Sequence, residues 1–275
     1  MTDGRAFGLL LFSTDPTFIR VARAAGVDAF AVDWEHRGKT HRQAGADTEI
    51  NRHGVAELRR VRAATEAPVL CRINGPGVTT GNEIQLAIAA DADEILVPMV
   101  RSPADVESIL RQVDGRCGVG ILIETSDAVR SAASLGVLPL ARVYVGLNDL
   151  AIDRRSATIF DAISDGTVEQ LRPWFPMPFG FGGLTLPDAG SPIPCRLLIA
   201  EMRRLECQFS FLRRSFHHDI QGRDPAIEIP RLREALGQAT RRDDERIARD
   251  QIALAAAIHA WAEAKTGGLL PLSRG

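Results

Sequence analysis

Residues 118–127 read Gly118-Val119-Gly120-Ile121-Leu122-Ile123-Glu124-Thr125-Ser126-Asp127, and they show the unit from which the chain is built. The first six are mostly apolar with little alternation, which is typical of a parallel strand covered on both faces. Ser126-Asp127 then starts a helical pattern, because both side chains accept hydrogen bonds from the free N–H groups of a first turn. The segment predicts a strand followed by a helix, with Glu124 between them.

The same unit recurs from one end of the chain to the other. Strands are predicted at 7–13, 28–33, 68–73, 94–98, 118–123, 142–145, 179–183 and 208–212. Helical patterns follow them at 17–25, 54–65, 82–90, 104–113, 127–134, 156–172, 196–205 and 227–239. Eight such units predict an α/β fold, a single (β/α)₈ TIM barrel. An open doubly wound sheet is disfavoured, because no glycine-rich phosphate turn follows the first strand.

One domain and a C-terminal addition account for the whole length. We predict a barrel catalytic domain at 1–240 and, at 241–275, a helix and tail that pack on the barrel or on a neighbouring subunit. The final helix is predicted at 241–264, where Ile247, Leu254, Ile258 and Trp261 form an apolar stripe that needs a partner surface. Two insertions, at 34–53 and 173–178, are predicted as a charged loop and a stiff connector.

Composition excludes several classes of protein. The formal charge of the 275 residues is −2, which argues against binding driven by bulk charge to nucleic acid or to a membrane surface. No apolar run reaches 18 residues, and the N-terminus has neither a basic region nor a cleavage site, so no membrane span or signal peptide is expected. The four cysteines are scattered singly, which favours a reduced, cytoplasmic protein.

Polar residues gather where the predicted strands end, which is where TIM barrels hold their reacting groups. They are Asp33, Trp34, Glu35 and His36, then Arg72 and Asn74, then Glu124, then Asn148 and Asp149, then Arg213 and Arg214. The paired arginines either recognise a phosphate or sugar acid or pair with local carboxylates.

Glu124 and Asp149 follow consecutive strands, so both carboxylates are expected in one mouth. Adjacent carboxylates repel unless a positive group lies between them. Mg²⁺ or Mn²⁺ is commonly held by one or two carboxylates plus substrate and water, which would leave room for a bidentate 2-oxo acid. The alternative is that each carboxylate caps its loop or pairs with an arginine.

Five segments, in order and at matching spacing, resemble the HpcH/HpaI aldolase and citrate lyase β-subunit superfamily of metal-dependent barrels. They are Asp33-Trp34-Glu35-His36 and residues 68–74, 92–100, 123–129 and 145–150. The resemblance covers roughly residues 7 to 215, and five matched segments are far more specific than any one of them.

The resemblance implies roles for individual residues. Glu124 and Asp149 match the ligands of a divalent metal, Mg²⁺ or Mn²⁺ and possibly Co²⁺, and Arg72 matches the guanidinium that holds a pyruvate-type carboxylate or enolate oxygen. His36 and Asp33 match the base and the carboxylate that orients it.

The predicted substrate pocket is lined by Trp34, Pro98, Met99 and Asn148 together with Arg72. Trp34 departs from the family, which has a small residue there, and we expect its ring to narrow the mouth. The resemblance also implies a homo-oligomer, a trimer or hexamer with exchanged C-terminal helices.

The resulting hypothesis is a metal-dependent carbon–carbon lyase, an aldolase, with pyruvate or a related 2-oxo acid as the enolate partner and an aldehyde as the other substrate. A metal at the ketone oxygen stabilises the enolate, and a neutral imidazole can take the hydroxyl proton in retro-aldol cleavage. Two alternatives stay open: an acyl-CoA lyase of the citryl or malyl type, and a non-catalytic binding component of a surface-polysaccharide pathway.

Overall fold

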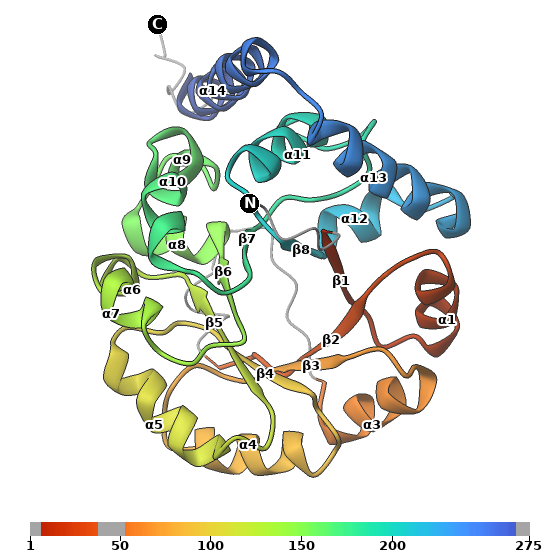
Figure 1. Cartoon of the computed structure of the whole chain (residues 1–275), viewed down its shortest axis with the longest axis vertical. Helices are drawn as coiled ribbons and strands as arrows, with labels where there is room; N and C mark the ends of the chain where they lie inside the picture. The colour runs from red at the N-terminus through yellow and green to blue at the C-terminus, as the bar shows by residue number, and fades with distance from the viewer. Residues whose placement is uncertain (1–6, 38–52, 268–275) are drawn as a thin grey trace, which may run out of the picture.

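The computed structural model describes residues 7–37 and 53–267, and within them eight parallel strands form a nearly closed barrel surrounded by helices (Figure 1). The strands are β1 (Gly8–Phe12), β2 (Ala29–Asp33), β3 (Val69–Arg72), β4 (Glu94–Val97), β5 (Gly118–Ile123), β6 (Arg142–Val145), β7 (Phe179–Phe181) and β8 (Phe209–Leu212). Their order in the sheet is β7-β6-β5-β4-β3-β2-β1-β8, with every ladder parallel. The predicted TIM barrel is confirmed.

The barrel approaches closure between β7 and β8, and Gly180 of β7 allows the two backbones to come close together. Gln208 N donates to the Phe179 carbonyl at 2.9 Å, and Ser210 Oγ donates to the Phe181 carbonyl at 2.8 Å. A Cβ on Gly180 would lie 2.1 Å from the Phe209 carbonyl oxygen, closer than any two such atoms approach. The side chain is absent here because the two backbones nearly touch.

The helices follow the strands as predicted, with differences at several turns. They are α1 (Pro16–Ala24), α3 (Val55–Ala64), α4 (Thr80–Ile88), α5 (Pro103–Val113), α6 (Ser126–Arg130), α7 (Ala132–Gly136), α8 (Leu147–Arg154), α9 (Asp161–Ser164), α10 (Thr167–Leu171), α11 (Cys195–Arg204), α12 (Arg214–Asp219), α13 (Pro225–Ala239) and α14 (Asp244–Gly267), with a 3₁₀ turn at Arg172–Trp174. The single helix predicted at 156–172 is wrong. Gly166 (φ 79°) adopts a left-handed conformation that interrupts it, and α8 begins directly after β6 and is capped at its C-terminus by Arg155 (φ 55°), also left-handed.

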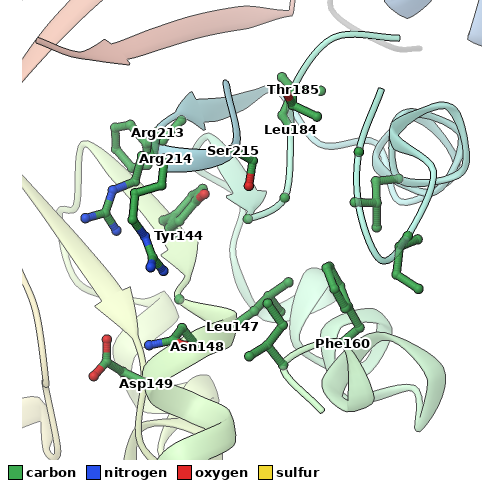
Figure 2. Close-up of a pocket in the computed structure, with 18 of the residues that line it drawn as sticks. Tyr144, Leu147, Asn148, Asp149, Phe160, Leu184, Thr185, Arg213, Arg214 and Ser215 are labelled. Carbon is green, nitrogen blue, oxygen red and sulfur yellow. The ribbon is translucent and has the colours of Figure 1, made fainter. Parts of the chain in front are cut away.

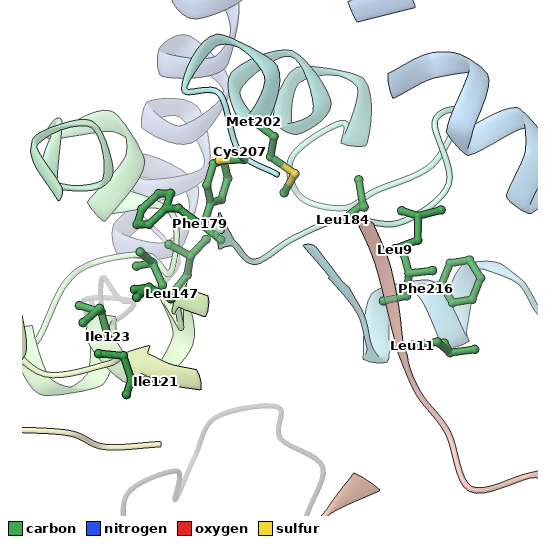
Figure 3. Packing of buried hydrophobic residues seen from close by; sticks show 14 of the residues in the cluster. Leu9, Leu11, Ile121, Ile123, Leu147, Phe179, Leu184, Met202, Cys207 and Phe216 are labelled. Carbon is green, nitrogen blue, oxygen red and sulfur yellow. The ribbon is translucent and has the colours of Figure 1, made fainter. Parts of the chain in front are cut away.

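Strand residues alternate between the lumen and the helix layer. Leu10, Leu70, Leu122, Tyr144 and Phe211 pack with one another inside the barrel. Their sequence neighbours pack outward in the larger core, in which Leu9 and Leu11 of β1 lie beside Phe216 of α12 (Figure 3). This period of two fixes which residues beyond each strand face the mouth.

The C-terminal helix α14 packs on α11 of the same chain (Figure 1). Leu254 and Ile258 of the predicted stripe are buried in the main core, whereas Ile252 on another face is 70% exposed. The trimer or hexamer and the boundary at residue 240 stay predictions. Most of the insertion predicted at 34–53 lies outside the described residues. None of the described helices is both long and apolar enough to cross a membrane.

Candidate active site

The mouth at the carboxyl ends of the strands carries a ring of inward-facing residues, set by the alternation that orders the lumen. Asp33 ends β2, Arg72 ends β3, Glu124 follows β5 and Arg213 follows β8. The first three are almost completely buried, at 1%, 1% and 2% exposure. Charged groups at this depth are stable only when they compensate one another or bind a ligand.

Arg72 is held by two carboxylates. Its Nε donates to Asp33 Oδ1 at 2.9 Å and its Nη2 to Asp33 Oδ2 at 2.6 Å, while Nη1 lies 3.3 Å from Glu35 Oε2. Burial lowers the pKa of Arg72, but the charges of Asp33 and Glu35 outweigh it and hold the pKa above its ordinary value. A guanidinium has five N–H donors and two are bonded to Asp33, so hydrogens on both terminal nitrogens remain for a ligand.

Glu124 is positioned by backbone. The Met99 N–H donates to Glu124 Oε2 at 3.0 Å, and Met99 itself takes a left-handed conformation, φ 55°, at the end of β4. Such a conformation costs a non-glycine residue free energy and is common at functional sites. The other oxygen, Oε1, lies over Gly146, where a Cβ would come within 2.3 Å of it.

Glu124 lies close to two other carboxylates, those of Asp149 and Glu35. Burial raises its pKa to about 8, and the negative charges of Asp149 and Glu35 act in the same direction. Asp149 lies in the first turn of α8 and is 7% exposed. These carboxylates crowd one region of the mouth, which favours uptake of a cation or a proton.

A cavity of about 150 Å³ opens beside Glu124 and Asp149 (Figure 2). Its polar side also carries Asn148, Arg213, Arg214 and Ser215, and its apolar side carries Leu147, Phe160 and Leu184. Tyr144 rises into it from β6, and burial raises the pKa of this phenol to about 12, so the hydroxyl keeps its proton. The lining of this cavity, as far as the chain is described, does not include Arg72, His36, Trp34, Pro98 or Met99.

The donor set fits a hard divalent cation. No three His, Cys, Asp or Glu side chains converge as a ligand set in residues 7–37 and 53–267, so a site built from the described protein groups alone is absent. Two carboxylates suit Mg²⁺ or Mn²⁺, which keep several waters and take further oxygens from substrate. The raised pKa of Glu124 shows that burial and the neighbouring carboxylates disfavour its charged form, which a cation would compensate.

His36 is exposed at the rim, and its tautomer is set by backbone. Its Nδ1 lies 2.9 Å from the Trp34 carbonyl oxygen. A carbonyl only accepts, so Nδ1 carries the hydrogen and Nε2 presents a lone pair. The contact that sets the tautomer of His36 thus comes from the Trp34 carbonyl, while both Asp33 oxygens hold Arg72. Asn74 Oδ1 accepts from the backbone N–H groups of His36 and Arg37, at 3.0 and 2.9 Å.

Trp34 does not narrow the mouth. It follows Asp33 by one residue, so the alternation turns its ring outward into the core between strands and helices, where it is 5% exposed. The indole N–H donates to the Gly54 carbonyl at 3.0 Å. This part of the predicted pocket is corrected.

Several features of the site escaped prediction. Tyr144 lies inside a predicted strand, and Ser215 lies beyond the end of one. A search for polar residues that directly follow a strand therefore finds neither. The period of two along β6 places Tyr144 in the lumen with Arg142 and Gly146, and could have found it.

The fold and the site define the class of protein: a TIM barrel whose mouth holds a buried acidic group suited to a divalent cation and a buried arginine held by two carboxylates. The family model described as HpcH/HpaI aldolase/citrate lyase matches residues 6–158, and the chain belongs to this family.

Two solved structures show the same fold. The HpcH/HpaI aldolase from Desulfitobacterium hafniense DCB-2 superposes with a TM-score of 0.57 at 18% identity, covering 76% of this chain and 87% of the other. A structure described as citrate synthase SbnG gives a TM-score of 0.58, also at 18% identity, covering 79% of this chain and 89% of the other. The comparison with curated proteins finds no match.

Proposed function

We propose that this protein is a divalent-metal-dependent carbon–carbon lyase that cleaves or forms an aldol bond, with pyruvate or a related 2-oxo acid as the enolate partner. The observation that carries the proposal is Glu124: a buried carboxylate, oriented by the Met99 amide, whose pKa is raised by burial and by Asp149 beside it. Membership in a family described as aldolase/citrate lyase supports the same reaction class.

Glu124 and Asp149 would hold the cation, Mg²⁺ or Mn²⁺. Bound there, a divalent cation supplies a Lewis acid for the carbonyl of a 2-oxo acid. The protein's own contribution is to keep both carboxylates fixed before substrate arrives, which avoids reorganisation during the reaction. The Met99 amide and the glycine at 146 fix Glu124, and the first turn of α8 fixes Asp149.

Arg72 contributes fixed positive charge at the same depth. Its two hydrogen bonds to Asp33 use two of its five donors, and hydrogens on Nη1 and Nη2 remain that can bind a carboxylate or enolate oxygen. Arg72 is close enough to Glu124 for its charge to lower the pKa of that carboxyl. Its rigid anchoring suits a group that must stabilise negative charge without moving.

His36 is the proposed base. Its Nε2 would take the hydroxyl proton of the aldol while the carbon–carbon bond breaks, leaving an aldehyde and an enolate. Nε2 would then give this proton to C3 of the enolate, which forms the 2-oxo acid and restores the neutral imidazole. In the forward direction the same nitrogen returns the proton. The Trp34 carbonyl, which accepts from Nδ1, keeps the lone pair on Nε2.

Exchange of the pyruvate methyl protons for deuterium tests this function without knowledge of the aldehyde. With Mn²⁺ in D₂O, the wild-type protein should exchange these protons, seen as loss of the methyl signal in proton NMR. Glu124→Gln and Asp149→Asn should each abolish exchange. Asp127→Asn, which removes an exposed carboxylate on nearby α6, should retain it. Absence of exchange in the wild-type protein would overturn the proposal.

A further inference from the structure

Arg72 and Arg213 both face inward at the mouth, but they have different partners. Arg72 makes two hydrogen bonds to Asp33 and an ion pair with Glu35, and it does not line the cavity. Arg213 lines the cavity, and among the residues that the structure describes one carboxylate lies within 4 Å of it, Asp33, at 3.8 Å from Nη2. That Asp33 oxygen already accepts a 2.6 Å bond from Arg72. Arg213 thus has unused donors next to open space.

Packing holds the Arg213 guanidinium in place. It stacks on the Phe12 ring at 4.7 Å from the centroid, and its side chain is 34% exposed. Stacking covers the apolar face of a guanidinium and leaves its edge, which carries the N–H groups, for a ligand. Within the described part of the chain, the guanidinium of Arg213 donates no hydrogen bond. Burial and the like charge of Arg72 hold the pKa of Arg213 below its ordinary value, which an anion would reverse.

Arg213 shares its cavity with the proposed cation site. Figure 2 shows Arg213 and Arg214 on the side of the cavity that Asn148 and Asp149 also line. The volume, about 150 Å³, is that of a cavity that holds a molecule about the size of benzene. A ligand that reaches both ends is therefore short.

We propose that Arg213 is the receptor for a carboxylate or phosphate on the aldehyde substrate, so that the enzyme selects short anionic aldehydes over neutral ones. The inference rests on the proposed function for the identity of the second substrate. The carboxylate of the 2-oxo acid itself would be engaged at the Glu124 and Asp149 end of the cavity, which leaves Arg213 for the other reactant. A site built to bind a charged group discriminates against an analogue that lacks it, because the partly buried charge of Arg213 then loses that partner.

Anion binding to the metal-free protein tests the receptor independently of catalysis. Inorganic phosphate and, separately, acetate are titrated calorimetrically into protein treated with EDTA, and the two arms show which anion Arg213 prefers. Arg213→Gln should weaken the preferred anion at least tenfold and Arg213→Lys less. Arg130→Gln, an exposed arginine on α6, should leave binding unchanged. Absence of binding, or equal binding by Arg213→Gln, overturns the inference.

A second measurement needs no variant. Phenylglyoxal modification of wild-type protein, mapped by mass spectrometry, should label Arg213 and be suppressed by the bound anion, with Arg130 labelled equally in both samples. Failure of the anion to protect Arg213 overturns the inference even if Arg213→Gln does not fold.

Two further arms test whether the anion belongs to the second substrate. Phosphate or acetate should bind the protein loaded with Mn²⁺ and oxalate, a mimic of the 2-oxo acid, with an affinity changed less than threefold. Mutual exclusion would assign Arg213 to the 2-oxo acid and overturn the inference.

With pyruvate as donor, Arg213→Gln should lower kcat/KM for glyoxylate at least tenfold and for glycolaldehyde less than twofold. An equal loss for both aldehydes also contradicts it. Failure of the proposed function alone would leave metal-free anion binding intact.

Discussion

Gly146 gives the sharpest structural test of the proposed cation site, because a single methyl group there displaces one carboxylate. A Cβ on Gly146 would lie 2.3 Å from Glu124 Oε1, 2.5 Å from Cγ and 2.8 Å from Cδ. Ordinary contact begins near 3.4 Å, so the carboxylate must retreat by about 1 Å. Its other oxygen is bonded to the Met99 amide, which opposes that movement.

The change in Gly146→Ala is steric. The backbone at residue 146 has φ −83° and ψ 87°, which lies near a conformation that alanine adopts. Overpacking of this kind costs about 1–3 kcal/mol of folding stability. Metal–ligand distances in well-formed sites lie within about 0.2 Å of their usual values. We therefore expect Mn²⁺ affinity to fall at least about 100-fold, which corresponds to about 2.7 kcal/mol.

Mn²⁺ binding measured by electron paramagnetic resonance, together with thermal unfolding, checks this result. Gly237→Ala is the matched control, because nothing lies within 4 Å of a Cβ at this position on α13. Alanine is the better helix former there, so stability should rise by about 0.5–1 kcal/mol with Mn²⁺ affinity unchanged. A folded Gly146→Ala protein that binds Mn²⁺ as tightly as wild type would refute the placement of Glu124 at the cation.

Three further predictions concern the groups around the site. Asp33→Asn should lower the free energy of unfolding by about 2–3 kcal/mol, because it removes one of the two carboxylates that pair with buried Arg72. The control Asp165→Asn, in an exposed ion pair, should lower it by less than about 1 kcal/mol. Equal losses of stability in urea denaturation would contradict the network around Arg72. Trp34→Phe should lower the free energy of unfolding by about 1–2 kcal/mol through loss of the hydrogen bond to Gly54, and it should leave the KM for pyruvate unchanged. A changed KM would indicate that the Trp34 ring contacts the substrate at the mouth. Cys117 is the one half-buried thiol of the four cysteines, and burial and the charge of Glu94 raise its pKa to about 11. Because the thiolate is the reactive form, a disulfide reagent should label Cys117 on the order of a hundredfold more slowly at pH 8 than a free cysteine, and about tenfold faster with each pH unit up to about 11. Labelling at pH 8 as fast as that of a free cysteine would contradict the burial of this thiol.

Most of the fold was predictable because its signals are local. Continuous apolar runs fix each strand, as at Gly118–Ile123, and the cap and first-turn proline at Ser102-Pro103 fix the start of α5. The interruptions after β6 were not predictable in the same way. Arg155 takes a left-handed conformation that its residue type does not favour, and tertiary packing decides it.

The site was predictable in part. Position at a strand end is enough to place Asp33, Arg72, Glu124 and Arg213 at the mouth, because parallel strands end on the same face. The pairings within the mouth depend on distances between strands. Asp33 binds Arg72 across the β2–β3 ladder, where the two residues are in register, and Nδ1 of His36 lies against the Trp34 carbonyl. Trp34 was misplaced because a strand-end position alone does not say which face a side chain occupies, whereas the parity of β2 does.

The central claim, that Glu124 and Asp149 together hold one divalent cation, is tested most directly by a double-mutant cycle of Mn²⁺ binding. We expect one Mn²⁺ per chain in the wild-type protein, at least 100-fold weaker binding in Glu124→Gln and in Asp149→Asn, and little further loss when both changes are combined, because either one already destroys the shared site. Single variants that retain wild-type affinity, or losses that simply add, would show that the two carboxylates do not bind the same ion.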